Sequence, residues 1–124
     1  MPSNVFIIGT MVPGNPVGLF SDSVARRRFA MIPLLPNYEA LRHFHRDTEF
    51  EVDGLVRTLN QINSLVENPR YLVGITYFLR KDLSQHIEEI WRFEVEPCIE
   101  EAFYDDMEKV ESFRWSKMRR RLTR

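Results

Sequence analysis

The sequence predicts a chain in two parts, an α/β segment over residues 1–36 and an all-helical domain over residues 37–124. The first part is predicted by two short apolar runs, Val5–Ile8 and Phe29–Pro36, which enclose a loop rich in proline and glycine. The second part is predicted by a change of period, because after Pro36 the apolar residues recur with the spacing of an amphipathic helix. We therefore place the boundary near Pro36.

The first part resembles the end of a parallel sheet. Val5–Ile8 is a continuous apolar run, which is typical of a strand buried on both faces. Ser21 or Asp22 is expected to cap a short helix that runs through Arg28. Phe29–Pro36 has the length of a second strand and is ended by prolines, which cannot donate to a ladder. Two short strands do not form a stable sheet alone, so we expect them to pair with strands outside this segment.

The start of the helical part has clear signals. Asn37 is a good N-cap for a first helix, and a second helix is expected from Val52 to Glu67 because its apolar residues follow the 3.6-residue period closely. The segment Tyr71–Leu79 is apolar with one glycine. It predicts either a short strand or a turn packed under the helices.

The later helices are marked by caps and by a proline. Asp82 with Gln85 three residues later is a capping-box pattern at the start of a third helix. Pro97 is expected to kink that helix or to restart it. A last helix is expected from about Asp106 to Leu122.

Composition limits the class of protein. The chain has 124 residues and a formal net charge of -1, which suits one domain or part of a larger one and gives no bulk attraction to nucleic acid or to an anionic membrane. A single cysteine, Cys98, excludes an internal disulfide and a cysteine-cluster zinc site. No apolar run approaches the length of a membrane span, and no secretory signal is recognisable. We expect a cytoplasmic protein with no membrane contact.

Four stretches together resemble one family. The run "NVFIIGTM", followed after fourteen intervening residues by "RRRF", resembles the McrB-type branch of the AAA+ NTPases, which are GTP-hydrolysing motor subunits of modification-dependent restriction systems. Further on, "VGITYFL" and "IEEIWRFEVEPCIEEAFYDD" resemble elements of that family's helical lid. The resemblance covers nearly the whole chain. It implies the C-terminal part of a AAA+ P-loop NTPase module, in which the end of the parallel-sheet core precedes a helical lid.

The resemblance implies roles for particular residues. Arg27 and Arg28 fall where the family carries an arginine that stabilises the transition state at a neighbouring subunit's nucleotide, a role that suits the planar, permanently charged guanidinium. Asn15 falls on the family's sensor aspartate. Val12 and Pro16 replace the polar asparagine and the arginine of the same loop, so the water-positioning function is mostly lost.

The resemblance also implies cofactors and partners. These are GTP or ATP with Mg²⁺ in the intact assembly, an N-terminal AAA+ half or neighbouring AAA+ subunits in a homo-oligomeric ring, an McrC-type nuclease subunit, and DNA indirectly. The 124 residues contain no G-x-x-x-x-G-K-[ST] loop and no acidic Walker B strand. Without the loop nothing cradles the phosphates, so this chain alone is not expected to hydrolyse nucleotide.

Three other features have a functional and a structural interpretation. His43 and His45 lie two apart, which points them to different helix faces, so we expect surface histidines rather than zinc ligands. The glutamates of the third helix are expected on its solvent-exposed face. The basic tail "RWSKMRRRLTR" either contacts DNA phosphates or a partner's acidic face, or forms an amphipathic helix with Trp115, Met118 and Leu122 inward. In the second case Asp105, Asp106, Glu108 and Glu111 are available to pair with its arginines.

Two further hypotheses for the whole chain stay open on sequence alone. In one, the chain is a freestanding, non-catalytic interaction protein that binds an intact motor subunit through its helices. In the other, it is a small helical domain in which the "RRRF" match is accidental.

Overall fold

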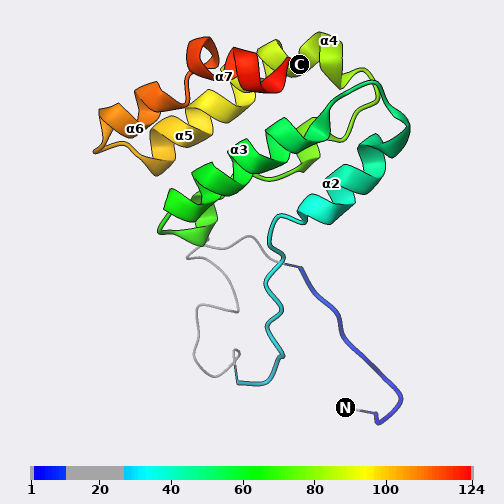
Figure 1. The fold of residues 1–124 in the computed structure, drawn as a ribbon. Coiled ribbons are helices and arrows are strands. Elements are labelled where there is room, and N and C mark those ends of the chain that lie inside the picture. The colour runs from blue at the N-terminus through cyan, green and yellow to red at the C-terminus, as the bar shows by residue number, and fades with distance from the viewer. Residues whose placement is uncertain (1, 11–26, 124) are drawn as a thin grey trace. The chain divides into compact units, whose positions relative to one another are not determined.

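The computed structural model describes residues 2–10 and 27–123, and within these ranges the chain is helical or irregular (Figure 1). It divides into two compact units, residues 1–33 and 34–124. The helix predicted to start at Ser21 or Asp22 lies mostly outside the described residues. The second unit is an all-helical domain, as the sequence predicts.

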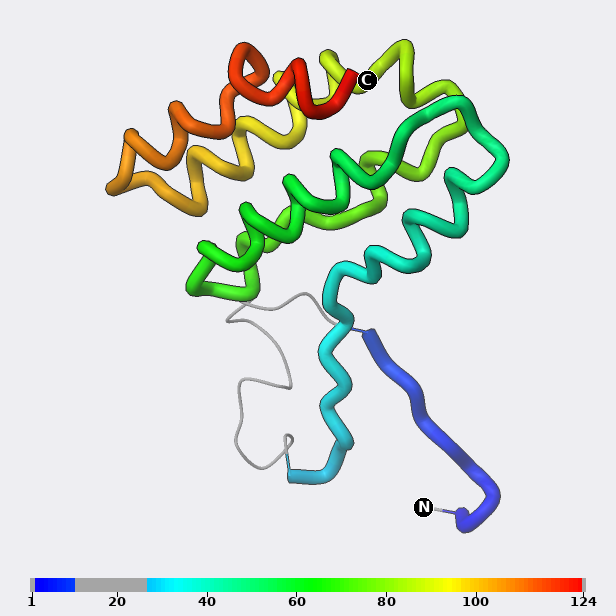
Figure 2. The backbone as a smooth tube through the Cα atoms, in the orientation of Figure 1, coloured from blue at the N-terminus to red at the C-terminus, as the bar shows by residue number. Residues whose placement is uncertain are grey.

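The two predicted strands do not form. In the described ranges, neither Val5–Ile8 nor Phe29–Pro36 has the hydrogen bonds of a strand, and Figure 2 traces both as irregular chain. Their apolar side chains lie open to solvent, with Phe6 89%, Ile8 94% and Ile32 80% exposed. A strand exists only where a neighbour pairs with its backbone, and these residues find no such neighbour in the described part of the chain. The expected α/β remnant is therefore not shown.

The helices of the second unit have these bounds: α2 Tyr38–Phe44, α3 Val52–Leu65, α4 Leu83–Ile90, α5 Glu96–Ala102, α6 Met107–Ser112 and α7 Trp115–Leu122. Three short 3₁₀ turns and one π turn connect them: η1 His45–Asp47, η2 Pro69–Tyr71, η3 Thr76–Phe78 and the π turn η4 Trp91–Val95. The Asn37 cap is confirmed, because its Oδ1 accepts a hydrogen bond from the backbone N–H of Ala40 at 3.1 Å. The long helix predicted after Val52 is confirmed as α3.

The core lies where α3 meets the later helices. Leu55, Leu59 and Ile62 of α3 are fully buried, as their helical spacing predicts. Opposite them Trp91 is fully buried, and its Nε1 donates to the backbone oxygen of Phe113 at 2.8 Å. That bond satisfies the one polar atom of the indole, so the largest side chain of the core is buried without an unpaired donor.

The apolar segment Tyr71–Leu79 is a turn rather than a strand. Asn63 of α3 holds it through both ends of its amide: Oδ1 accepts from the N–H of Val73 at 2.8 Å, and Nδ2 donates to the Val73 oxygen at 2.9 Å. These two bonds satisfy the backbone N–H and C=O of Val73, as pairing with a neighbouring strand would do. Val73 and Phe78 are consequently buried under the helices.

Pro97 restarts the helix instead of breaking it. The chain passes from α4 through the π turn η4 into α5, with Pro97 in the first turn of α5. Proline has no N–H to give to the preceding turn, and a wider turn accommodates this lost bond. The last predicted helix is in fact two helices. Asp106 caps α6 by accepting from the Lys109 N–H at 3.1 Å, and the chain turns at Phe113 and Arg114 before α7 begins.

Helices α3 and α7 touch at the level of the backbone. A Cβ atom added to Gly54 of α3 would lie 2.3 Å from the backbone oxygen of Arg121 in α7. Only glycine leaves room for this approach. Gln61, two turns further along α3, accepts a hydrogen bond from Arg121 Nη1 at 3.4 Å. The first long helix and the last helix are therefore held together along one side.

Gly54→Ala is expected to lower the free energy of unfolding by about 1–3 kcal/mol, because the new methyl group forces two helix backbones apart. The intrinsic preference of helices for alanine acts in the opposite direction by about 1 kcal/mol. Urea unfolding followed by circular dichroism measures the balance. Gly74→Ala is the control, since a Cβ there meets nothing closer than 3.9 Å. A Gly54→Ala protein as stable as the parent would show that the helices do not approach so closely.

Candidate functional site

The described structure includes only two of the residues predicted for catalysis. Arg27 and Arg28 lie in an exposed turn of the first unit, and neither forms an ion pair with another described residue. Asn15 lies outside the described residues, as do Val12 and Pro16. The arginine finger and the sensor therefore stay predictions, and the site that the structure shows belongs to the helical unit.

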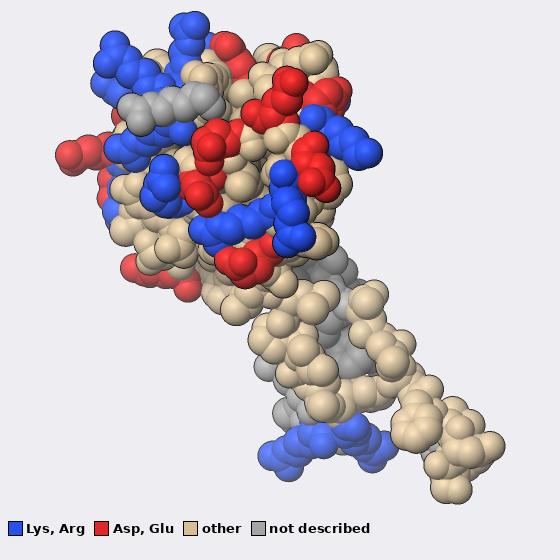
Figure 3. All heavy atoms as spheres, turned by 45° about the vertical axis from the view of Figure 1, so that its right-hand side comes forward, with Lys and Arg blue, Asp and Glu red and all other residues tan. Residues whose placement is uncertain are grey.

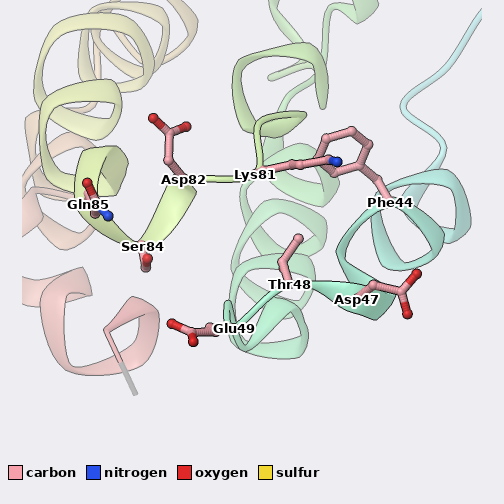
Figure 4. A pocket seen from close by; sticks show the side chains of 8 residues that line it. All are labelled: Phe44, Asp47, Thr48, Glu49, Lys81, Asp82, Ser84 and Gln85. Carbon is pink, nitrogen blue, oxygen red and sulfur yellow. The ribbon is translucent and has the colours of Figure 1, made fainter.

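An open pocket of about 460 Å³ lies between the η1 region and the start of α4. Figure 4 shows its two walls, with Thr48 and Glu49 on one and Ser84 and Gln85 on the other. Its lining is completed by Phe44, Asp47, Lys81 and Asp82. Three carboxylates and one lysine are among the lining residues, so the pocket is polar and carries more acidic than basic side chains.

A buried histidine positions one wall of the pocket. His45 is only 3% exposed, so the expectation that it lies at the surface is wrong, whereas His43 is exposed. The Nδ1 of His45 bonds the Thr48 hydroxyl at 2.8 Å, and its Nε2 bonds the backbone oxygen of Phe78 at 2.8 Å. The ring thus ties η1 to η3. Its role in the structure is to crosslink two turns, because both ring nitrogens are engaged.

The other wall is set by Asp82. The predicted capping box is wrong, because the Asp82 side chain accepts no hydrogen bond from the N–H groups of α4. Its carboxylate instead accepts two bonds from Arg80, at 2.8 and 3.0 Å, and lies 3.1 Å from Nε2 of His86. The Arg80 guanidinium lowers the pKa of Asp82 to about 2. A paired arginine outcompetes the backbone because a charge-assisted bidentate bond is the stronger one.

A second polar cluster joins α5, α6 and α7 at Arg114. Nη1 of Arg114 donates to Glu96 at 2.9 Å and to Glu100 at 2.6 Å, and its Nε donates to Glu111 at 3.3 Å. Glu96 also accepts from the backbone N–H of Trp115 at 2.8 Å, which caps the start of α7. These carboxylates, Glu96 foremost, raise the pKa of Arg114.

The Arg114 cluster corrects the expectation that all glutamates of the third helix face water. The Glu96 side chain is 14% exposed, and each of its two carboxylate oxygens accepts a hydrogen bond, one from Arg114 and one from the Trp115 N–H. Sequence reasoning missed it because its partner lies 18 positions later, beyond any helical period. Nη1 and Nε of Arg114 are both engaged by carboxylates, two from α5 and one from α6. The cluster therefore holds the C-terminal helices together.

The cations of the basic tail are of two kinds: some pair with a carboxylate, and others form no ion pair within the described ranges. Of the acidic stretch, Glu111 pairs with Arg114 of the tail, as expected, whereas Asp106 pairs with Lys109, which precedes the tail. Trp115, Met118 and Leu122 of α7 are buried, which confirms the amphipathic helix. The cations on the outer side of α7 make no ion pair within the described ranges: Lys117, Arg119, Arg120 and Arg121.

A metal-ligand cluster and a membrane-spanning helix are both absent from residues 2–10 and 27–123. In these ranges no three His, Cys, Asp or Glu side chains are grouped as metal ligands would be. Likewise, none of the helices described there has both the length and the apolar character that crossing a bilayer requires.

Comparison with known proteins gives two matches. Residues 54–111, from α3 to α6, match the family model described as "McrB, alpha-helical lid domain". The chain is also 28% identical over 130 aligned positions to the "Type IV methyl-directed restriction enzyme EcoKMcrB subunit" of Escherichia coli (strain K12). That alignment covers 91% of this chain but 28% of the relative's length, so the chain spans little more than a quarter of that protein. No solved structure matches significantly.

Proposed function

From the match of residues 54–111 to the McrB alpha-helical lid model, we propose that the chain is the C-terminal part of a restriction-system motor subunit. In this proposal the chain supplies the lid of a AAA+ module that hydrolyses GTP or ATP with Mg²⁺ and drives an McrC-type nuclease against modified DNA. The observation that carries the proposal is the match of a contiguous helical body, α3 to α6, to this one kind of lid.

The exposed apolar segments of the first unit support the proposal. Phe6, Ile8 and Ile32 are each at least 80% exposed, and leaving such side chains in water costs about 25 cal/mol per Å² of apolar surface. Exposed surface of this kind marks a place where another part of the assembly binds. We propose that Val5–Ile8 and Phe29–Pro36 become inner strands when a AAA+ core pairs with them.

In the assembled ring, Arg27 and Arg28 act on a neighbour. Their exposure and their lack of a carboxylate partner in the described ranges leave the guanidinium groups available for a phosphate. The same subunit contributes little to its own active site, because Val12 and Pro16 carry no polar group where the family positions its water. The chain alone therefore releases no phosphate, and the lid closes over nucleotide bound by the rest of the module.

Two grafts into the E. coli relative test this function. In the lid graft, residues 37–124 replace the relative's equivalent lid; in the full graft, residues 1–124 replace its equivalent segment. We expect the lid graft to assemble and to hydrolyse GTP or ATP in the presence of Mg²⁺, since the relative's own sensor loop is retained. The full graft is expected to assemble but to hydrolyse nucleotide slowly, because Val12 and Pro16 replace the polar residues that position the attacking water.

The controls separate folding from function. Size-exclusion chromatography and circular dichroism establish assembly and helix content for each graft. Addition of the relative's nuclease partner and methylated DNA then tests whether turnover is coupled to cleavage. A lid graft that folds and assembles but hydrolyses no nucleotide would contradict the proposal, as would phosphate release by the isolated 124-residue chain.

The second candidate function is a freestanding protein that binds an intact motor subunit. The exposed apolar side chains of the first unit would then bind that motor subunit. Pull-down of the intact relative by the tagged chain distinguishes the two. Stable capture of assembled motor, together with failure of both grafts to support turnover, is the result that this second function predicts.

A further inference from the structure

Exposed cations lie on α7 and on the adjoining helix α3. We define the basic face as Arg57, Lys117, Arg119, Arg120 and Arg121, all of which are exposed. In Figure 3 blue side chains gather at the upper edge of the helical unit, where α7 lies in Figure 1. We propose that this basic face contacts the phosphate backbone of a nucleic-acid duplex. The inference does not depend on the proposed motor function.

The first argument is the absence of compensating carboxylates. The sequence of α7, WSKMRRRL, has no acidic residue, and no cation of the basic face forms an ion pair with any residue in 2–10 or 27–123. Arg121 has only the neutral amide of Gln61 as a side-chain partner. Arg42 and Arg114, by contrast, are each held by two or more carboxylates. The basic face therefore has no counter-charge among the described residues and is open to an anion from outside.

The second argument is geometric. Arg57 lies three residues after Gly54 and four before Gln61, so all three share one side of α3. Gly54 and Gln61 both contact Arg121, which places Arg57 beside α7. The helix dipole favours cations in the last turn of α7, but Arg57 is on another helix. Lys117 and Arg121, one turn apart, repel each other, and a bound phosphate removes that cost.

The third argument selects the kind of anion. The apolar side of α7 is used up in the core, since Trp115, Met118 and Leu122 are 3% exposed or less, so nothing is left to enter a lipid surface. Described aromatic residues of α7 and of the preceding turn, Trp115 and Phe113, are buried, which removes the stacking platform of single-strand binding. Cations on two adjoining helices suit the closely spaced phosphates of a duplex, without readout of sequence.

The test is fluorescence anisotropy of a short labelled DNA duplex of mixed sequence, titrated with the full chain over a range of salt concentrations. We expect log Kobs to fall linearly with log salt, with a slope of about -0.9 for each phosphate neutralised. The variant Arg57→Gln with Arg120→Gln should reduce the steepness of that slope by about two and the affinity by about tenfold or more. Thermal unfolding confirms that the variant is folded.

The matched control is Arg46→Gln with Arg70→Gln, which removes the same charge from exposed positions on η1 and η2. It should bind the duplex as the parent does. Equal losses in the two variants would show that only net charge matters and would overturn the proposal. Absence of salt-dependent duplex binding would also overturn it. The proposal would also be overturned if the chain bound a single strand, anionic vesicles or polyglutamate more tightly than the duplex, compared at equal concentrations of negative charge.

Discussion

Subunits of the full graft that carry Arg27→Ala and Arg28→Ala are expected to lose about 10³-fold or more of the nucleotide turnover that they support in a neighbouring subunit. An arginine finger lowers the barrier by stabilising charge that develops on the transferred phosphoryl group, and alanine offers no substitute for it. The measurement uses rings mixed from the full graft and an E. coli subunit whose own equivalent arginines are replaced. Only the graft then supplies a finger, so turnover reports its action in trans.

The matched control for the finger is Arg46→Ala in the same graft. Arg46 is also exposed and unpaired within the described ranges, but it belongs to η1 of the helical unit. It should leave turnover in mixed rings unchanged. Single replacements identify which of Arg27 and Arg28 acts. Undiminished turnover with both replaced, in rings shown to be mixed, would contradict the assignment.

Glu96→Ala is expected to lower the free energy of unfolding by about 3 kcal/mol. The change leaves the Trp115 N–H without its acceptor and removes the most buried carboxylate around Arg114, and losing one partner of such a pair costs about 3–5 kcal/mol in a fully buried site. Arg114 is 27% exposed and keeps Glu100 and Glu111, which places the expected loss at the lower end. Urea unfolding provides the measurement.

Two comparisons make the Glu96 result specific. Glu96→Gln keeps an oxygen for the Trp115 N–H and removes only the charge, so it should cost about half as much as alanine. Glu101→Ala, on the exposed side of the same helix and without an ion pair in the described ranges, should change stability by less than about 0.5 kcal/mol. If Glu96→Ala and Glu101→Ala were equally mild, the Arg114 cluster would not be what holds α5 to α7.

Features that depend on near neighbours in the sequence were predictable. The apolar period of α3, the Asn37 cap and the buried side of α7 follow from residues within two helical turns of one another, and the structure confirms them. Asp82 shows the limit even at short range. Its spacing to Gln85 predicts a cap, but Arg80, only two residues away, takes the carboxylate.

Features that depend on distant residues were not predictable. Glu96 is placed by Arg114, and His45 by the backbone of Phe78, 33 positions later. The apolar run at Val5–Ile8 has the composition of an inner strand, but composition gives no pairing partner, and in the described residues no strand forms. For the candidate site, sequence resemblance selected Arg27 and Arg28, whereas the open pocket and the basic face needed the packing of separate elements.

The close approach at Gly54 has a mechanical consequence. The first long helix and the last helix share a backbone contact between residues 67 positions apart, so these two helices cannot move independently of each other. Any torque applied at one helix is carried to the others as a rigid rotation, since packed interiors deform little. The helical unit then moves as one body.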